Sequence, residues 1–176
     1  MSQHSTPTRT DQDRAVVHLT WHRIGEMVDH IAEQVRNDGA PRVVVAVLRG
    51  GATPAVWLSH RLRLRDVRTV EVTHTADDSR HAAKTPEPVA VNPGSLGDLT
   101  GQDVLVVDDV AGTGHTLAAT VRLVSQAGAA RVRTAVCAVN NDNWVGTAPA
   151  EATITYIGEN TRGWVVFPWE GGINEG

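Results

Sequence analysis

Residues 104–117, VLVVDDVAGTGHTL, carry the pattern that decides the fold. The first four residues are apolar and mostly β-branched, which is typical of a parallel strand that is buried on both faces. Two adjacent carboxylates, Asp108 and Asp109, end this strand, and a short run with two glycines and two threonines follows them. Apolar residues then recur at helical spacing, which predicts a helix over residues 118–124. The stretch therefore predicts a strand–turn–helix unit with polar chemistry at its turn.

The turn has the composition of a phosphate-binding loop. Gly112 and Gly114 permit a tight turn and a close approach of the backbone to a ligand. Thr113 and Thr116 add hydroxyl groups where the helix begins, and the free N–H groups of a helix N-terminus attract phosphate. The two adjacent carboxylates repel each other unless a cation or hydroxyl groups lie between them, and a ribose diol with a divalent cation meets that need. The alternative interpretation is an ordinary strand-to-helix connection in which an aspartate caps the helix.

A second strand-to-helix connection has the same character. Residues 42–48, RVVVAVL, again predict a doubly buried strand, and Arg49, Gly50 and Gly51 follow before a helix expected over residues 53–63. Two glycines allow backbone N–H groups to face an anion, and the arginine adds positive charge. This loop is therefore either a second anion site or a plain turn.

Composition limits the class of protein. A chain of 176 residues is long enough for one domain with a full core, and alternating strand and helix patterns indicate the α/β class. The net charge is −4 and the basic residues do not cluster, which argues against a nucleic-acid-binding surface. No apolar stretch is long enough to cross a membrane. The single cysteine, Cys137, lies in an apolar run, which favours a buried strand residue in a reducing cytoplasm.

The remaining segments complete the expected domain organisation. Residues 1–17 are polar and are expected to form a disordered leader, with residues 18–176 as a single domain. A helix capped by Thr20 is expected to end at Gly39. Further strands are expected over residues 68–72, 131–139 and 153–157. Residues 75–100 lose all periodicity and are rich in Pro, Gly, Asp and Ser, which predicts a long loop that is either functional or disordered.

Three motifs together resemble those of a known enzyme family. An apolar strand followed by two acids and then by TG-x-T resembles the motif with which type I phosphoribosyltransferases bind phosphoribosyl pyrophosphate (PRPP). The second loop, LRGGATP, resembles the RGG-x-x-P of the xanthine/hypoxanthine-guanine branch, and residues 164–170, WVVFPWE, resemble its W-[IV]-x-x-P-W-[DE]. The resemblance covers residues 19–170. It implies the type I phosphoribosyltransferase fold, with a central, mostly parallel sheet flanked by helices and a long flexible lid loop that carries Arg80 and Lys84.

The resemblance also implies an activity and its site. The family joins a heterocyclic base to C1 of PRPP and releases pyrophosphate, so the chain is expected to be a cytoplasmic pentosyltransferase and a homodimer or homotetramer. The implied catalytic residues are Arg49, Asp108 and Asp109, with Mg²⁺ bound by Asp109 together with PRPP. The implied base-binding residues are Trp164, Val165 and Gly112. The implied PRPP-binding residues lie in the two loops and are Arg49, Gly50, Gly51, Asp108, Asp109, Val110, Ala111, Gly112, Thr113, Gly114, His115 and Thr116.

Two positions depart from the purine-specific relatives. At the position of Gly112 those relatives carry an Asp that handles the proton on purine N7, and near O6 they carry a Lys where this chain has Val139 or Asn140. Three functions therefore remain open. The base is a purine or a close analogue; or it is an unusual base such as a 7-substituted 7-deazaguanine, for which Gly112 leaves room; or the chain is a PRPP-sensing regulator without chemistry. The acidic balance argues against a regulator that binds nucleic acid.

Overall fold

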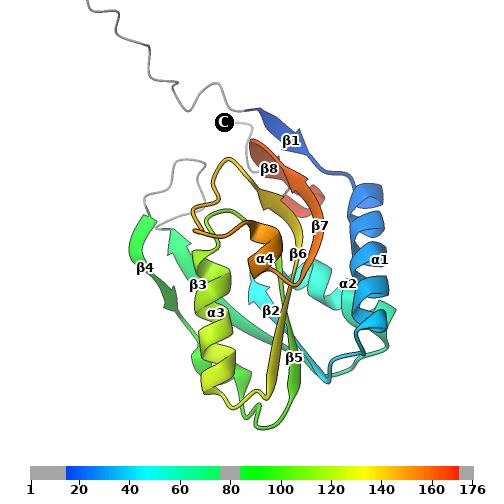
Figure 1. Cartoon of the computed structure of the whole chain (residues 1–176), viewed down its shortest axis with the longest axis vertical. Coiled ribbons are helices and arrows are strands. Elements are labelled where there is room, and N and C mark those ends of the chain that lie inside the picture. Colours follow the sequence, from blue (N-terminus) through cyan, green and yellow to red (C-terminus); the bar gives the residue numbers. More distant parts are fainter. Residues whose placement is uncertain (1–14, 76–83, 171–176) are drawn as a thin grey trace, which may run out of the picture.

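A central sheet covered by helices on both faces forms the body of the molecule (Figure 1). The computed structural model describes residues 15–75 and 84–170. The strands are β1 Val16–His18, β2 Val43–Leu48, β3 Val67–Thr75, β4 Lys84–Ala90, β5 Asp103–Ala111, β6 Arg131–Asn140, β7 Tyr156–Thr161 and β8 Trp164–Val166. The helices are α1 Trp21–Asn37, α2 Ala52–Leu62, α3 His115–Gln126 and the short α4 Ala150–Thr153, with 3₁₀ turns at Pro93–Leu96 and Pro168–Glu170.

The strand order confirms the expected α/β architecture. Within the described residues the large sheet runs β4-β3-β2-β5-β6-β7. All neighbouring strands are parallel except β4, which lies antiparallel to β3 at one edge. β1 and β8 form a separate parallel pair that lies beyond one end of the sheet (Figure 1). No described helix has both the length and the apolar composition that crossing a membrane requires.

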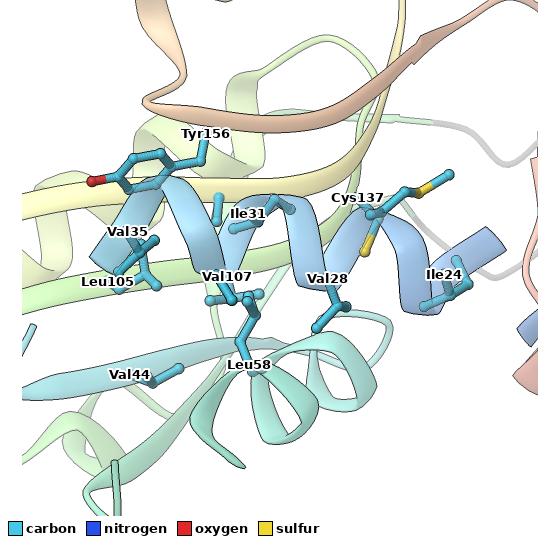
Figure 2. Packing of buried hydrophobic residues seen from close by; sticks show 14 of the residues in the cluster. Ile24, Val28, Ile31, Val35, Val44, Leu58, Leu105, Val107, Cys137 and Tyr156 are labelled. Carbon is cyan, nitrogen blue, oxygen red and sulfur yellow. The ribbon is translucent and has the colours of Figure 1, made fainter. Parts of the chain in front are cut away.

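The apolar strands separate two hydrophobic cores, because alternate residues of a strand point to opposite faces. On one face Val44, Leu105 and Cys137 pack against α1 and α2, as Figure 2 shows. On the other face Val45 and Val106 pack beneath α3. Both strands that were predicted to be doubly buried, β2 and β5, are so, and Cys137 is a buried strand residue as expected.

The first helix follows its sequence signals closely. The Oγ1 of Thr20 accepts a hydrogen bond from the backbone N–H of Arg23 (3.2 Å), which is the predicted N-cap. The helix ends at Asn37, and Gly39 follows with a left-handed φ of 86°. The helix therefore begins and ends where local chemistry placed it.

Several element boundaries differ from those predicted. β1 begins at Val16, inside the expected leader, because its backbone pairs with β8, a partner distant in the sequence. α3 begins at His115, three residues before the predicted start. The strand expected over residues 153–157 begins only at Tyr156, because residues 150–153 form α4.

The segment between residues 75 and 100 contains more regular structure than its composition indicated. Part of it forms β4 along the edge of β3, and a 3₁₀ turn follows. Asn92, between β4 and this turn, ties the segment to β3, because its Oδ1 accepts a hydrogen bond from the backbone N–H of Glu71 (2.6 Å). Arg68 donates hydrogen bonds to the carbonyl oxygens of Leu96 and Asp98. Residues 76–83, which include Arg80 of the expected lid, lie outside the described residues, as does the side chain of Lys84.

A buried polar network ties the far end of the sheet to α1. The guanidinium of Arg133, only 2% exposed as a residue, donates to both carboxylate oxygens of Asp103 (3.2 and 2.8 Å) and to the hydroxyl of Tyr156 (3.0 Å). That hydroxyl in turn donates to Oδ2 of Asp38 (2.9 Å). Because buried polar groups cost free energy when they lose a partner, this network depends on all of its members.

Replacing Tyr156 with Phe tests this dependence. Tyr156→Phe removes an acceptor from the buried Arg133 and a donor from Asp38, so we expect the free energy of unfolding to fall by about 1–3 kcal/mol. Urea denaturation measures the change. Ser125→Ala is the control, because its exposed hydroxyl bonds only within its own helix. Equal stabilities of the two variants would contradict the proposed role of the network.

Candidate functional site

The two loops singled out in the sequence meet at one place in the sheet. β2 and β5 are direct parallel neighbours, with Ala46 opposite Val107, so their carboxyl ends lie side by side. From β2 the chain continues to β3 on one side, and from β5 it continues to β6 on the other side. The point where the strand order divides in this way is the usual ligand site of an open parallel sheet. α2 and α3 also begin at this edge, so their N-termini face it.

The two loops are in contact, and glycine makes that contact possible. A Cβ placed on Gly50 would lie 1.8 Å from Oδ2 of Asp109, so the carboxylate occupies the space that a side chain would need. A Cβ on Gly51 would lie 2.5 Å from the carbonyl oxygen of Val47 and 2.6 Å from that of Val107. Gly50 therefore leaves room for the carboxylate of Asp109, and Gly51 allows the backbones of the two loops to approach each other.

The paired carboxylates carry shifted pKa values. Burial raises the pKa of Asp108 well above its ordinary range, and the charge of Asp109 adds to the rise. Burial also raises the pKa of Asp109 to about 6, and the charge of Glu170 adds to it. Backbone N–H groups partly offset these effects, since the N–H of Asp109 donates to Asp108 (2.9 Å) and that of Val110 donates to Asp109 (2.7 Å). The site thus concentrates carboxylates where a cation or hydroxyl groups would stabilise their charge.

The loop after β5 enters α3 at Gly114, where the backbone has a left-handed conformation that favours glycine. Gly114 has a φ of 83° and caps α3, and the N–H of His115, the first helical residue, donates to Oγ1 of Thr113 (3.4 Å). A Cβ on Gly114 would lie 2.8 Å from the ring of Trp144, which comes from the loop after β6. The ring of Trp144 therefore packs against the predicted phosphate loop at Gly114.

Two of the predicted base-binding residues, Trp164 and Val165, lie in β8, whereas the third, Gly112, lies in the loop between β5 and α3. Trp164 is half-buried at the start of β8, and its backbone N–H donates to the carbonyl oxygen of Ala15, just before β1 (2.8 Å). Gly163, which precedes it, is held on both sides of its backbone. Its carbonyl oxygen accepts from Nδ2 of Asn140 (2.6 Å), and its N–H donates to Oδ2 of Asp142 (2.9 Å). The loop after β6 therefore positions the segment that carries Trp164.

Some of the predicted site residues meet at the strand ends, and others have side chains that are buried in the cores. The structure brings together the loop of Arg49, Gly50 and Gly51 with that of Asp108 and Asp109. The side chains of Ala111 and Val165 are buried in the two cores, so these residues offer the site only their backbone. The peptide bond between Leu48 and Arg49 is cis, and the Arg49 side chain is exposed at the rim.

Other residues of the site were missed by the sequence analysis. The charge of Glu170 raises the pKa of Asp109. The carboxylate of Glu170 is held by a hydrogen bond from the backbone N–H of Phe167 (2.8 Å). Glu170 ends the WVVFPWE motif, which was the available signal. Asn143 and Trp144 lie against the phosphate loop, and only the polar, asparagine-rich composition of residues 140–143 hinted at them.

Comparison with known proteins gives matches over nearly the whole chain. The model of the family described as "Phosphoribosyl transferase domain" matches residues 19–175. The chain is 30% identical over 174 residues to a xanthine-guanine phosphoribosyltransferase of a Ruegeria species, covering 93% of this chain and 90% of that protein. It is 32% identical over 164 residues to the xanthine-guanine phosphoribosyltransferase of Roseobacter denitrificans, covering 87% and 84%. A purine phosphoribosyltransferase structure from Pyrococcus horikoshii is 33% identical, with a TM-score of 0.70 and coverage of 88% and 93%.

Two glycines of the site should respond differently to the same substitution. Gly51→Ala would force Cβ against two carbonyl oxygens, so we expect the free energy of unfolding to fall by about 1–3 kcal/mol or more. Gly112→Ala is the matched control, because the nearest atom to its added Cβ is 4.0 Å away, at Asn143. Urea denaturation compares the two. A Gly51→Ala variant as stable as Gly112→Ala would show that the backbones do not approach as closely as described.

The raised pKa of Asp109 predicts how stability depends on pH. An unfolded aspartate titrates near pH 4 and the folded Asp109 at about 6, so the folded chain binds more protons in this window. Stability from this group is therefore present at low pH and is lost as pH rises from about 4 to about 6. Asp109→Asn should reduce that loss in urea denaturation followed across pH.

The control for this titration has the opposite sign. Arg68 lowers the pKa of Asp66 by hydrogen bonding, so this group stabilises the fold above pH 4 and loses its effect as pH falls. Asp66→Asn should therefore remove a gain in stability with rising pH below about pH 4, whereas Asp109→Asn should flatten the decline between about pH 4 and about pH 6. An unchanged pH profile for Asp109→Asn would contradict the raised pKa.

Proposed function

The chain belongs to the phosphoribosyl transferase domain family, and we propose that it joins a 6-oxopurine base to PRPP, giving a nucleoside 5′-monophosphate and pyrophosphate. The observation that carries the proposal is the contact between the loop of Gly50 and the carboxylate of Asp109 at the dividing point of the sheet. The similarity to proteins named xanthine-guanine and purine phosphoribosyltransferases supports a purine-like base as the acceptor.

Each part of PRPP has a matching group in the proposed complex. The 5′-phosphate lies at the N-terminus of α3, against residues 111–116, because a helix N-terminus with hydroxyl groups beside it attracts an anion. Asp108 and Asp109 accept hydrogen bonds from the ribose diol. Arg49 and the backbone of Gly50 and Gly51 hold the pyrophosphate, whose negative charge grows as its bond to C1 breaks. Trp164 stacks on the base.

The acidic groups of the site also suit the Mg²⁺ ion expected with PRPP. Asp109 provides a carboxylate of the kind that Mg²⁺ prefers, and the nearby charges of Asp108 and Glu170 favour a bound cation. Among the described residues no cluster of three or more suitable side chains could enclose a metal by itself. This agrees with an ion that Asp109 holds jointly with phosphate oxygens and water. When bound, the metal neutralises charge on the leaving pyrophosphate.

A second acceptor is favoured by the space beside Gly112. Apart from Gly112 and its two chain neighbours, no atom lies closer than 4.0 Å to a Cβ placed there, and the backbone is not in the left-handed region, so a side chain would fit. A purine carrying a substituent at the position of N7, such as a 7-substituted 7-deazaguanine, would use this space. Asp at this position would occupy it and would favour an ordinary purine with N7–H instead.

The test combines ligand-induced stabilisation with a panel of bases. PRPP with Mg²⁺ at about a hundredfold above its dissociation constant should stabilise the protein by about 2.7 kcal/mol, and Gly50→Ala should lose this gain because its Cβ displaces Asp109. Gly94→Ala, which lies outside both loops and has no atom within 4 Å of the added Cβ, should keep it. The absence of any melting shift in the wild-type protein would refute the PRPP site.

The base panel then separates the two acceptors. We expect kcat/KM to be highest for guanine, xanthine or hypoxanthine in the wild-type protein. If 7-substituted 7-deazapurines are preferred instead, and Gly112→Asp reverses the preference, the second acceptor is the correct one. PRPP binding without transfer to any base would favour a regulator. The cytoplasmic location and the dimeric or tetrameric state remain predictions.

A further inference from the structure

Two consecutive residues of the loop after β6 lie over two glycines of the predicted phosphate loop. The Cβ of Asn143 is the nearest atom, at 4.0 Å, to the position that a Cβ on Gly112 would occupy. The ring of Trp144 lies 2.8 Å from the corresponding position on Gly114. Asn143 therefore borders the open space beside Gly112, where purine-specific relatives carry a carboxylate.

The loop that carries Asn143 is held at several points. The N–H of Asn143 donates to the carbonyl oxygen of Asn140 (3.1 Å), and Oδ1 of Asn140 accepts from the N–H of Asp142 (3.1 Å). Asn140 and Asp142 also hold both sides of the Gly163 backbone, next to Trp164. The indole N–H of Trp144 donates to the carbonyl oxygen of Ala148 (2.9 Å). These bonds fix the position of Asn143 relative to both Gly112 and the base-stacking segment.

The two residues that stand in place of the relatives' lysine are engaged elsewhere. Val139 is 0% exposed and belongs to the core beneath α3. The side-chain amide of Asn140 is engaged with the backbone of Gly163 and Asp142. Among the side chains outside the loop of Gly112 itself, the one that comes within 4.0 Å of the position of an added Cβ is that of Asn143, through its own Cβ, and it is a side chain that ends in a carboxamide.

A carboxamide matches one particular edge of a purine. It carries an acceptor oxygen and a donor NH₂ side by side, and asparagine pairs in this way with two adjacent groups on a base edge. A 6-oxopurine that reacts through N9 carries its proton on N7, so its N7–H donates and its neighbouring O6 accepts. One neutral amide can bond both groups, and it adds no charge to a site that already holds Asp108, Asp109 and Glu170.

We propose that Asn143 reads the N7–H and O6 edge of a 6-oxopurine and is the specificity-determining residue of the base site. Its oxygen accepts from N7–H and its NH₂ group donates to O6. It therefore does with one side chain what relatives do with an aspartate and a lysine. This inference rests on the proposed function, since it assigns the recognition of the base that the transfer reaction uses.

The test compares Asn143→Ala with Asn141→Ala, an exposed asparagine of the same loop. At saturating PRPP and Mg²⁺, Asn143→Ala should lower kcat/KM for guanine and hypoxanthine by at least about tenfold, because two hydrogen bonds to the base are lost. The KM for PRPP should stay within about twofold of wild type. Asn141→Ala should match the wild type in all of these constants.

A readout that a purely structural role would not change comes from a base without O6. Inhibition constants against guanine transfer should be measured for hypoxanthine and for unsubstituted purine. Asn143→Ala should weaken the binding of hypoxanthine more than that of purine, because purine has no O6 and so has no hydrogen bond at that position to lose. The melting shift with PRPP and Mg²⁺ confirms that the variant is folded.

The outcomes separate this inference from the proposed function. A wild-type protein that transfers ribose phosphate to no base refutes both. An active wild type in which Asn143→Ala behaves as Asn141→Ala refutes the role of Asn143 alone. Equal losses for hypoxanthine and purine, or a matching loss in PRPP affinity, would also refute it, because the residue would then act only on the loop.

Discussion

The parallel pairing of β2 with β5 is the constraint on which the site depends. The two strands are distant in the sequence, yet their carboxyl ends lie next to each other. They do so at the point where the strand order divides, with β3 on one side and β6 on the other. The loops that follow then approach so closely that neither glycine at residues 50 and 51 has room for a side chain. A displacement of either strand would separate the anion-binding loop from the paired acids.

The paired acids are costly to the protein without a ligand. Burial raises the pKa of both Asp108 and Asp109, and a neighbouring carboxylate adds to each rise, Asp109 for the first and Glu170 for the second, so at neutral pH their charges destabilise the fold. The large apolar core around β2 and β5 compensates for this, since it holds the strand ends in place whether or not the acids are satisfied. A site that is electrostatically strained when empty gains affinity for a ligand that brings hydroxyl groups and a cation.

The far half of the site is organised by one loop. Residues 140–144 contact the phosphate loop through Asn143 and Trp144, and they hold the backbone before Trp164 through Asn140 and Asp142. This loop therefore connects the proposed phosphate-binding loop with the segment of the proposed base site. The same arrangement explains how the chain can lack the aspartate and lysine of its purine-specific relatives and still present a polar group beside Gly112.

Local sequence determined the parts of this protein that depend on neighbouring residues. The doubly buried strands, the cap of α1 at Thr20 and the two glycine-containing loops were all predictable, because hydrophobic periodicity, capping and glycine chemistry act over a few residues. Family membership was predictable for the same reason, since its motifs are short and continuous. Tertiary structure alone decided the rest. β4 is a strand, and β1 begins as early as Val16, because partners distant in the sequence pair with them, and Asn143, Trp144 and Glu170 lie near the proposed site because the sheet brings separate strand ends to one edge. Contacts of this kind leave no periodic signal in the sequence, because they are set by strand order and not by spacing along the chain.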